Sequence, residues 1–359
     1  MKAAVAATLA FLAGIACAQA RAFADAPEPP DASARRAASP FVRLSTNSND
    51  ADLVAGDDAF ERGDWREAQR RYSAARATAR TRAAGAVGVA RVMIARVGVA
   101  LDFGAAKGDA TVAAAAADLE RVVRNNSSFG PGFVELGRAK LLLGDAQGAV
   151  LAMRRGTELL VDDAEAHSEL GVGLLATGDV EGAIRELSKA ASMDPGSGPR
   201  HGNLGTALMM AGRSGEAVVE YEARAHIDDS DARAHSDLGT ALLATPDLDR
   251  AVAELRRAVA LNPNGPSFHQ NLGYALQQAG RLDEAIIEYR SALRIDPKLV
   301  SAWINLGTAL ARAPATRAEA RAAFDRARVL SPNDPRVRAN LAELEALDPT
   351  GSVDAGVTR

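Results

Sequence analysis

The chain contains little of what disulfide-bonded domains and large globular cores are built from. Its 359 residues include one cysteine, and aromatic residues make up 4% of the sequence. A single cysteine excludes an intramolecular disulfide, and the scarcity of aromatic side chains favours many thin Ala/Leu interfaces over one large core. The formal net charge is -4 and no Lys/Arg-rich patch occurs, so the electrostatic signature of a nucleic-acid-binding protein is absent.

Motifs of catalysis and metal binding are also lacking. The sequence has no G-x-x-x-x-G-K-[ST] phosphate loop, no H-E-x-x-H and no G-x-S-x-G. The stretch GAAKGDAT at 104–111 resembles a phosphate loop only superficially, and we expect an ordinary loop there. We therefore predict a protein that is not an enzyme, with no catalytic residues, no cofactor and no metal site.

The only long apolar run opens the chain. Residues 3–16 follow Lys2 and precede small residues, which is typical of a secretory signal peptide and too short to span a membrane. Two processing sites fit: cleavage after Ala24 removes residues 1–24, whereas 14–17 loosely resembles a bacterial lipobox, with a signal at 1–16 and a lipidated Cys17. The first alternative predicts a periplasmic or secreted protein, and the second predicts one anchored in the bacterial envelope through Cys17 alone.

A repeat of 34 residues dominates the rest of the sequence. The dipeptide Leu-Gly recurs at this constant step, and an alanine follows each of the first five leucines by thirteen residues. The six leucines of this dipeptide are Leu136, Leu170, Leu204, Leu238, Leu272 and Leu306. Residues 25–48 before the repeats are rich in Pro, Ala, Ser and charge and predict a disordered spacer, and residues 349–359 predict a disordered tail.

This pattern resembles the tetratricopeptide repeat (TPR) family, in which each copy is a pair of helices. The resemblance implies an all-α fold, an α-solenoid in which about eight helix pairs over residues 49–334 form a right-handed superhelix. A weaker first copy surrounds Trp65 and Tyr72, an irregular copy spans 83–129, and a capping helix follows at 335–348. Glycines such as Gly212 then end first helices and form interhelix turns, so they do not hold a phosphate.

Four of the five histidines also follow the repeat, at His167, His201, His235 and His269. Zinc needs ligand nitrogens about 2.0–2.1 Å away, whereas neighbouring helices lie about 8–10 Å apart, so these four side chains cannot converge on one ion. They occupy the position where the family often has Trp, as at Trp303. We expect them to pack between helices.

The residue before each Leu-Gly pair is polar in every copy. Because the first helix of each pair lines the concave groove in this family, the resemblance implies that these side chains face a partner. Amide groups donate and accept hydrogen bonds, which suits the backbone of an extended peptide, although asparagine is also common at this position for structural reasons. The pattern is similar to the asparagine ladder in the TPR region of O-GlcNAc transferases, but the chain has no catalytic domain of that kind. The predicted groove residues are Glu135, Glu169, Asn203, Asp237, Asn271 and Asn305.

The sequence thus predicts a scaffold of the bacterial cell envelope that binds a protein or an extended peptide and no nucleic acid. Assembly of pili, secretion systems or outer-membrane machinery is the context that the resemblance implies. The alternative is a recognition subunit of an enzyme complex, such as one for glycan or polysaccharide synthesis, with catalysis on a partner chain.

Overall fold

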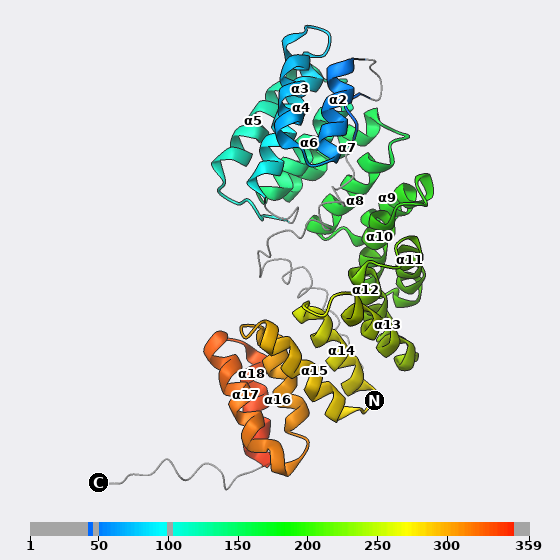
Figure 1. The fold of residues 1–359 in the computed structure, drawn as a ribbon. Helices are drawn as coiled ribbons and strands as arrows, with labels where there is room; N and C mark the ends of the chain where they lie inside the picture. The colour runs from blue at the N-terminus through cyan, green and yellow to red at the C-terminus, as the bar shows by residue number, and fades with distance from the viewer. Residues whose placement is uncertain (1–41, 46–49, 99–102, 348–359) are drawn as a thin grey trace, which may run out of the picture. The chain divides into compact units, whose positions relative to one another are not determined.

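The computed structural model describes residues 42–45, 50–98 and 103–347, and the regular structure in these ranges is entirely helical (Figure 1). The all-α, solenoid-like fold is therefore confirmed. The predicted signal segments, Cys17, most of the spacer and the tail at 349–359 lie outside the described residues. None of the described helices is long and apolar enough to cross a membrane.

Helices alternate between the first and the second member of a pair. The first helices are α2 (Ala51–Glu61), α4 (Arg82–Val97), α6 (Gly130–Leu142), α8 (Ala164–Thr177), α10 (Gly198–Met210), α12 (Ala232–Leu242), α14 (Pro266–Gln278) and α16 (Val300–Leu310). The second helices are α3 (Trp65–Ala77), α5 (Ala110–Asn125), α7 (Ala146–Leu159), α9 (Val180–Met193), α11 (Ser214–Ile227), α13 (Leu248–Leu261), α15 (Leu282–Ile295) and α17 (Arg317–Leu330). Helix α18 (Pro335–Leu347) follows the last pair.

The turn inside most pairs has a local cause. Gly63, Gly144, Gly178 and Gly280 follow first helices with positive φ, a conformation that glycine adopts without steric cost. In three of these turns an aspartate comes next, and its carboxylate accepts the backbone N–H at the third position of the second helix, as Asp179 does from Gly182 at 2.9 Å. Gly212, which follows α10, also has positive φ, at 74°. This confirms the prediction that Gly212 belongs to an interhelix turn.

Two pairs depart from this turn in ways that the sequence explains. Between α12 and α13, Pro246 stands where other copies have glycine, and no residue of that turn has positive φ. The last pair carries one extra residue near Pro314, which the structure accommodates as a 3-10 turn, η2 (Pro314–Thr316). The Thr316 hydroxyl closes this turn by donating to the Leu310 carbonyl at 2.5 Å.

The copy predicted to be irregular forms an ordinary helix pair, α4 and α5, with a long connection. Gly104 N–H and Ala106 N–H donate to the carbonyls of Leu141 and Leu142 at 2.8 and 2.9 Å, so this connection is fastened to the end of α6. Asp109 then caps the start of α5 by accepting from Val112 N–H at 2.9 Å. The GAAKGDAT stretch is thus a loop through Asp109, as predicted, whereas its last two residues begin α5.

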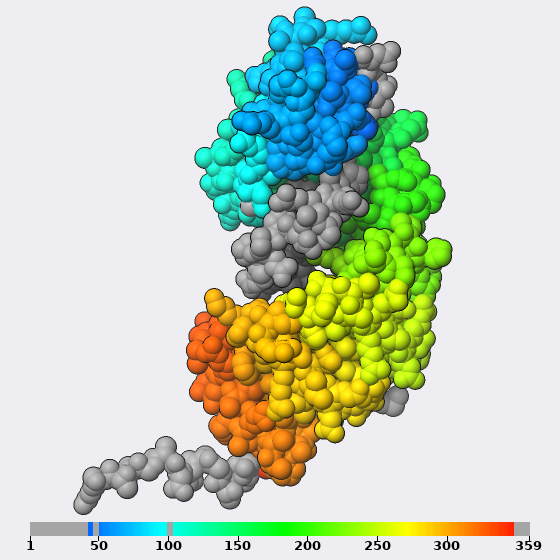
Figure 2. Space-filling model, in the orientation of Figure 1, coloured from blue at the N-terminus to red at the C-terminus, as the bar shows by residue number. Residues whose placement is uncertain are grey.

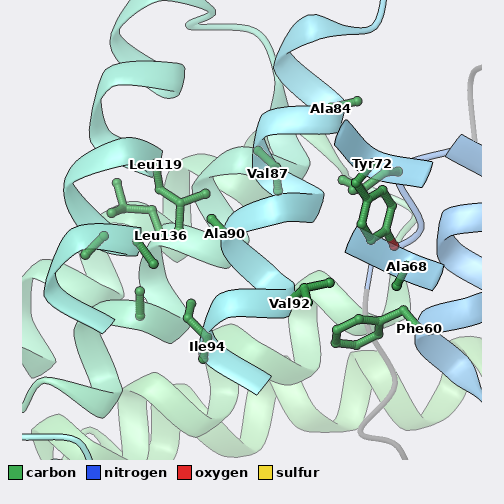
Figure 3. Close-up of a cluster of buried hydrophobic side chains, with 14 of the residues drawn as sticks. Phe60, Ala68, Tyr72, Ala84, Val87, Ala90, Val92, Ile94, Leu119 and Leu136 are labelled. Atoms are coloured by element: carbon green, nitrogen blue, oxygen red, sulfur yellow. The ribbon is translucent and has the colours of Figure 1, made fainter. Parts of the chain in front are cut away.

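The chain divides into two compact units, Met1–Arg213 and Ser214–Arg359, which are described separately. In the first unit, Phe60, Tyr72, Val87, Leu119 and Leu136 belong to one buried cluster contributed by α2 to α6 (Figure 3). In the space-filling view, α2 to α5 form a continuous surface in blue and cyan (Figure 2). In the second unit, Tyr289 and Phe324 are the largest fully buried side chains.

Within each unit, the first helices of successive pairs contact one another. Helix α4 touches α2 and α6, α8 touches α6 and α10, and α14 touches α12 and α16. Among the described residues, no two second helices of successive pairs pack against each other to this extent. In each unit the first helices therefore form the more closely spaced layer, and we call this layer the first-helix row of that unit.

One boundary predicted from composition is wrong. The spacer was expected to be disordered through residue 48, yet Val42 and Leu44 are 3% and 4% exposed. Composition describes the stretch as a whole, whereas these two apolar side chains find partners in helices far along the chain. Val42 packs with Val134 of α6 and Ala166 of α8.

Candidate partner-binding face

All six predicted groove residues lie on first helices. Glu135 is on α6, Glu169 on α8 and Asn203 on α10 in the first unit. In the second unit, the remaining three are placed at equivalent positions of their helices, namely Asp237 on α12, Asn271 on α14 and Asn305 on α16. Their common position follows from the 34-residue step, but their exposure and their partners differ.

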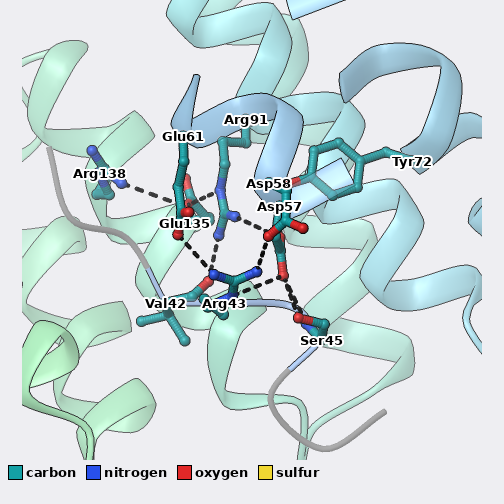
Figure 4. A network of polar contacts seen from close by, with 10 residues as sticks. All are labelled: Val42, Arg43, Ser45, Asp57, Asp58, Glu61, Tyr72, Arg91, Glu135 and Arg138. Carbon is teal, nitrogen blue, oxygen red and sulfur yellow. Dashed lines mark hydrogen bonds and ion pairs between the residues drawn. The ribbon is translucent and has the colours of Figure 1, made fainter. Parts of the chain in front are cut away.

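Glu135, which was predicted as a groove residue, is buried among charged groups of its own chain and is not accessible to a partner in this structure. The residue is 2% exposed, and its Oε1 lies 2.7 Å from Arg91 Nε and 3.5 Å from Arg138 Nη1 (Figure 4). Burial by itself would raise the pKa of Glu135, but the two guanidinium groups outweigh it and hold the pKa below its ordinary value. Its role is to fix Arg91.

Glu169 extends the same network of charges along α8. Its Oε1 lies 3.3 Å from Arg138 Nε, and its side chain is 15% exposed. Burial raises the pKa of Glu169, and burial together with the neighbouring Glu169 raises the pKa of Glu165 well above the usual range. Glu165 also lies 3.3 Å from Arg200 Nη2. The acidic end of the predicted ladder is thus largely occupied by internal ion pairs.

Asp237 is likewise engaged with its own chain. Its Oδ2 lies 2.7 Å from Nη1 of Arg224 in α11, and Arg224 also holds Asp231 at 2.8 Å. The Asp237 side chain is 24% exposed. Burial raises its pKa to about 6, although the Arg224 guanidinium acts in the opposite direction.

The three asparagines are the predicted residues that remain suited to a partner. Asn203, Asn271 and Asn305 are half-buried. The Asn271 side-chain amide donates to Ser236 Oγ at 3.2 Å, and that of Asn203 lies 3.5 Å from Ser168 Oγ. Each of these bonds joins neighbouring first helices and orients the amide.

The histidines pack between helices, as their spacing predicts. In His167, His235 and His269, Nδ1 contacts a glutamate of the second helix at 2.6 to 2.8 Å, and Nε2 contacts a backbone carbonyl at 3.0 to 3.1 Å. His201 Nε2 lies 3.0 Å from the Pro195 carbonyl. Each ring has its own partners in its own repeat, and no group of side chains suited to a metal ion occurs among the described residues.

Sequence reasoning missed Arg91 and Asp57, which are 2% and 0% exposed. Nη1 of Arg91 lies 3.6 Å from Asp57 Oδ1, and the same carboxylate oxygen accepts from the Tyr72 hydroxyl at 2.8 Å (Figure 4). Asp57 and Arg91 stand one 34-residue step apart, but the residue type at this position changes from aspartate to arginine, so the repeat pattern gave no reason to select them. The available signal was a charged residue in an otherwise apolar helical stretch, as at Arg91.

A shallow pocket lies beside the start of α3 and the end of α4. Its volume is about 500 Å³, and its lining includes Trp65, Arg66, Gln69 and Arg96. Arg96 donates to Gln69 Oε1 at 3.0 Å across this surface. None of the predicted groove residues contributes to it.

Comparison with known proteins supports the repeat assignment. Family models described as tetratricopeptide repeat match residues 134–198, 174–242 and 236–300. The matches show that residues 134–300 consist of tetratricopeptide repeats. A search of curated protein sequences finds no match.

Solved structures with the same architecture differ widely in sequence. The Cut9-Hcn1 hetero-tetramer of APC/C has a TM-score of 0.57 and 14% identity, over 84% of this chain and 57% of that one. Pseudomonas aeruginosa pilF has a TM-score of 0.51 and 21% identity, over 61% of this chain and 99% of that one. MamA protein is 27% identical over 47% of this chain and 92% of its own, with a TM-score of 0.42. At these identities, the first two likenesses show the fold alone.

Proposed function

We propose that this protein is a non-enzymatic scaffold of the bacterial cell envelope that holds extended segments of a partner protein along the first-helix row of each unit. The observation that carries the proposal is the recurrence of half-buried asparagines on the first helices, at Asn203 in the first unit and at Asn271 and Asn305 in the second. An extended peptide presents backbone N–H and C=O groups at regular intervals, and an amide side chain can pair with either.

The contacts within the protein favour this use of the amides. Ser236 and Ser168 are buried, and their hydroxyls hold the Asn271 and Asn203 amides from the preceding first helix. An amide that is already oriented loses less conformational entropy when it binds a ligand, so each such contact is more favourable than one from a mobile side chain. The charged residues at the equivalent positions, Glu135, Glu169 and Asp237, are less available to a partner because they form ion pairs with arginines of their own chain.

The test replaces Asn203, Asn271 and Asn305 by Ala together. Each hydrogen bond to a partner contributes about 0.5–1.5 kcal/mol, so we expect the triple variant to lose about 2–4 kcal/mol of binding free energy. A photo-crosslinking residue at position 271 should capture the envelope partner, while the same residue at the exposed Val219 of α11 should not. Mass spectrometry identifies the captured chain, and an enzyme of glycan synthesis would favour the alternative role as a recognition subunit.

A matched triple variant controls for the loss of amides as such. Asn125, Asn264 and Asn333 are exposed and lie outside the first helices, so their replacement by Ala should leave capture unchanged. A melting curve accompanies each protein. If the groove variant melts far below the wild type and still captures the same partner, the asparagine row is structural and the proposed site is wrong.

A further inference from the structure

Four residues that precede the first helix pair, Val42–Ser45, lie against the first-helix row of the first unit (Figure 4). They contact residues of α2, α4, α6 and α8, which are the four first helices at this end of the chain. Val42 and Leu44 are almost fully buried there. A short non-helical stretch of the chain thus occupies the layer on which we place the partner segment.

The row binds the backbone of this stretch. The Val42 carbonyl accepts a hydrogen bond from Arg91 Nη2 at 2.8 Å. Ser45 N–H donates to Asp57 Oδ2 at 2.9 Å, and its hydroxyl donates to the same oxygen at 2.8 Å. Hydrogen bonds from buried charged groups to backbone are shorter and stronger than neutral ones, and they do not depend on the identity of the bound side chain.

Side-chain contacts add a defined preference. Val42 fits against Val134 and Ala166, and Leu44 joins the buried cluster of the first unit. Between them, Nη2 of Arg43 lies 2.5 Å from Asp58 and its Nη1 lies 2.9 Å from Glu61. The surface therefore accommodates an apolar residue, a basic residue, another apolar residue and a serine, in that order.

The groups that bind the backbone are held by the helices themselves. Glu135 fixes Nε of Arg91 at 2.7 Å, and the Tyr72 hydroxyl fixes Asp57 at 2.8 Å. Both receptor groups thus have a helix-borne partner that does not involve Val42–Ser45. They are oriented for a peptide whether the chain's own residues or another segment supplies it.

We propose that the face of α2, α4, α6 and α8 around Arg91 and Asp57 is a peptide-binding site for a partner segment of the type apolar–basic–apolar–Ser. The chain's own Val42–Ser45 occupies this site as an intramolecular competitor that the partner displaces. The inference deepens the proposed function and rests on it, since it assigns a second stretch of the same row and the chemistry that this stretch recognises.

Competition within one chain sets the size of the effect. A tethered segment acts at a high effective concentration, so the site is free for only a fraction of the time. The apparent dissociation constant of a partner rises by the inverse of that fraction. Any change that weakens the Val42–Ser45 contacts and spares the helices should tighten binding of an added peptide.

The experiment measures binding of a fluorescein-labelled peptide of residues 40–47, PFVRLSTN, to the full-length chain by fluorescence anisotropy. Arg43→Glu places a negative charge opposite Asp58 and Glu61 and leaves the helices intact, so the peptide should bind this variant about tenfold more tightly than the wild type. Arg155→Glu, which breaks an exposed ion pair with Glu158 in α7, is the matched control and should bind as the wild type does.

A further protein variant and an altered peptide test whether the change in affinity arises at this site. Adding Asp58→Ala and Glu61→Ala to Arg43→Glu should abolish the gain, and a peptide with Glu in place of its Arg should not bind. If circular dichroism shows that Arg43→Glu loses helix, Leu44→Ser replaces it and must give the same gain. Equal affinities of wild type and variant, or a gain that survives loss of both acids, would overturn the proposal.

Size-exclusion chromatography tests whether the site is instead filled by the Val42–Ser45 segment of a second copy of the chain. A wild-type dimer that Arg43→Glu converts to monomer would show that copies exchange this segment, and this result would also overturn the proposal. Failure here is distinguishable from failure of the proposed function, because the anisotropy reports on α2 and α4. The asparagine variants change α10, α14 and α16 and are read by partner capture.

Discussion

Single residues at one repeated position serve different purposes in this protein. Glu135 and Asp237 stand at equivalent places in their repeats, yet Glu135 is buried beside Arg91 and Asp237 is partly exposed beside Arg224. Asn271 at the same position binds a serine of the preceding repeat. The repeat sets where the side chain begins, and the neighbouring charges decide whether it is available to a partner.

Asp237 makes the stability of the second unit depend on pH. Its folded-state pKa of about 6 lies above the value of 3.8 for a free side chain, so the folded state holds the proton more tightly than the unfolded state. The stability that the protonated group contributes is fully present below about pH 4 and is lost as the pH rises through about 6. Asp237→Asn cannot lose a proton, and Arg224 keeps Asp231 as a partner in this variant.

We therefore expect Asp237→Asn to gain stability relative to the wild type as the pH rises. The difference in unfolding free energy, variant minus wild type, should increase by about 1–2 kcal/mol between pH 4.5 and pH 7.5. Urea denaturation at the two pH values measures it. A difference that is the same at both would show that burial of Asp237 has no effect on its titration.

Helix pairs are the elements that repeat. Their packing tolerates a change of side chain when the hydrogen bond from a ring nitrogen to a backbone carbonyl is kept. His269 Nε2 lies 3.0 Å from the Pro263 carbonyl, and Trp303, in the equivalent place one repeat later, donates from Nε1 to the Pro297 carbonyl at 2.9 Å. An imidazole and an indole can substitute for each other because each presents a ring nitrogen to the carbonyl six residues earlier.

Close approach between helices is less tolerant. A Cβ at Gly85 of α4 would lie 2.3 Å from Arg76 N and 2.6 Å from the Tyr72 carbonyl oxygen, and both atoms belong to the backbone of α3. Gly85→Ala must push the two helices apart, and we expect a loss of about 1–3 kcal/mol in unfolding free energy.

Gly215 provides the matched control for this substitution. It lies in α11, is exposed, and has no atom within 4 Å of a Cβ built at its position. Gly215→Ala should therefore leave stability unchanged or raise it by about 0.5 kcal/mol, since alanine favours helix. Chemical denaturation of the two variants gives the comparison, and similar changes in both would contradict the packing argument.

For the whole molecule, the cellular location is the main open prediction, and it depends on the N-terminal segment that precedes the repeats. The predicted signal peptide and the alternative lipobox at Cys17 lie outside the described residues, and our placement of the protein in the cell envelope depends on them. The two alternatives differ physically, because a buried acyl chain contributes about 0.8 kcal/mol per CH₂ to membrane affinity.

Fractionation of cells that express the full-length chain separates the two alternatives. If Cys17 is lipidated, the protein should sediment with membranes, and Cys17→Ser should release it or block its processing. If the signal is cleaved after Ala24, mass spectrometry should find a mature chain that begins at Asp25, and Cys17→Ser should have no effect. A chain that keeps its N-terminus and stays in the cytoplasm would refute the envelope proposal.

The sequence by itself determined the helical pairs and the turns of this protein, because both follow from local chemistry that recurs every 34 residues. A glycine such as Gly178 ends a helix and an aspartate such as Asp179 begins the next, whatever lies elsewhere in the chain. Only the tertiary structure decided which polar residues are buried and which remain accessible. Arg91 reaches Glu135 and Val42 across 44 and 49 residues, and no repeating pattern predicts such contacts. Because burial depends on everything that packs nearby, the sequence could not show that Glu135 is buried or that Val42–Ser45 pack against the first helices.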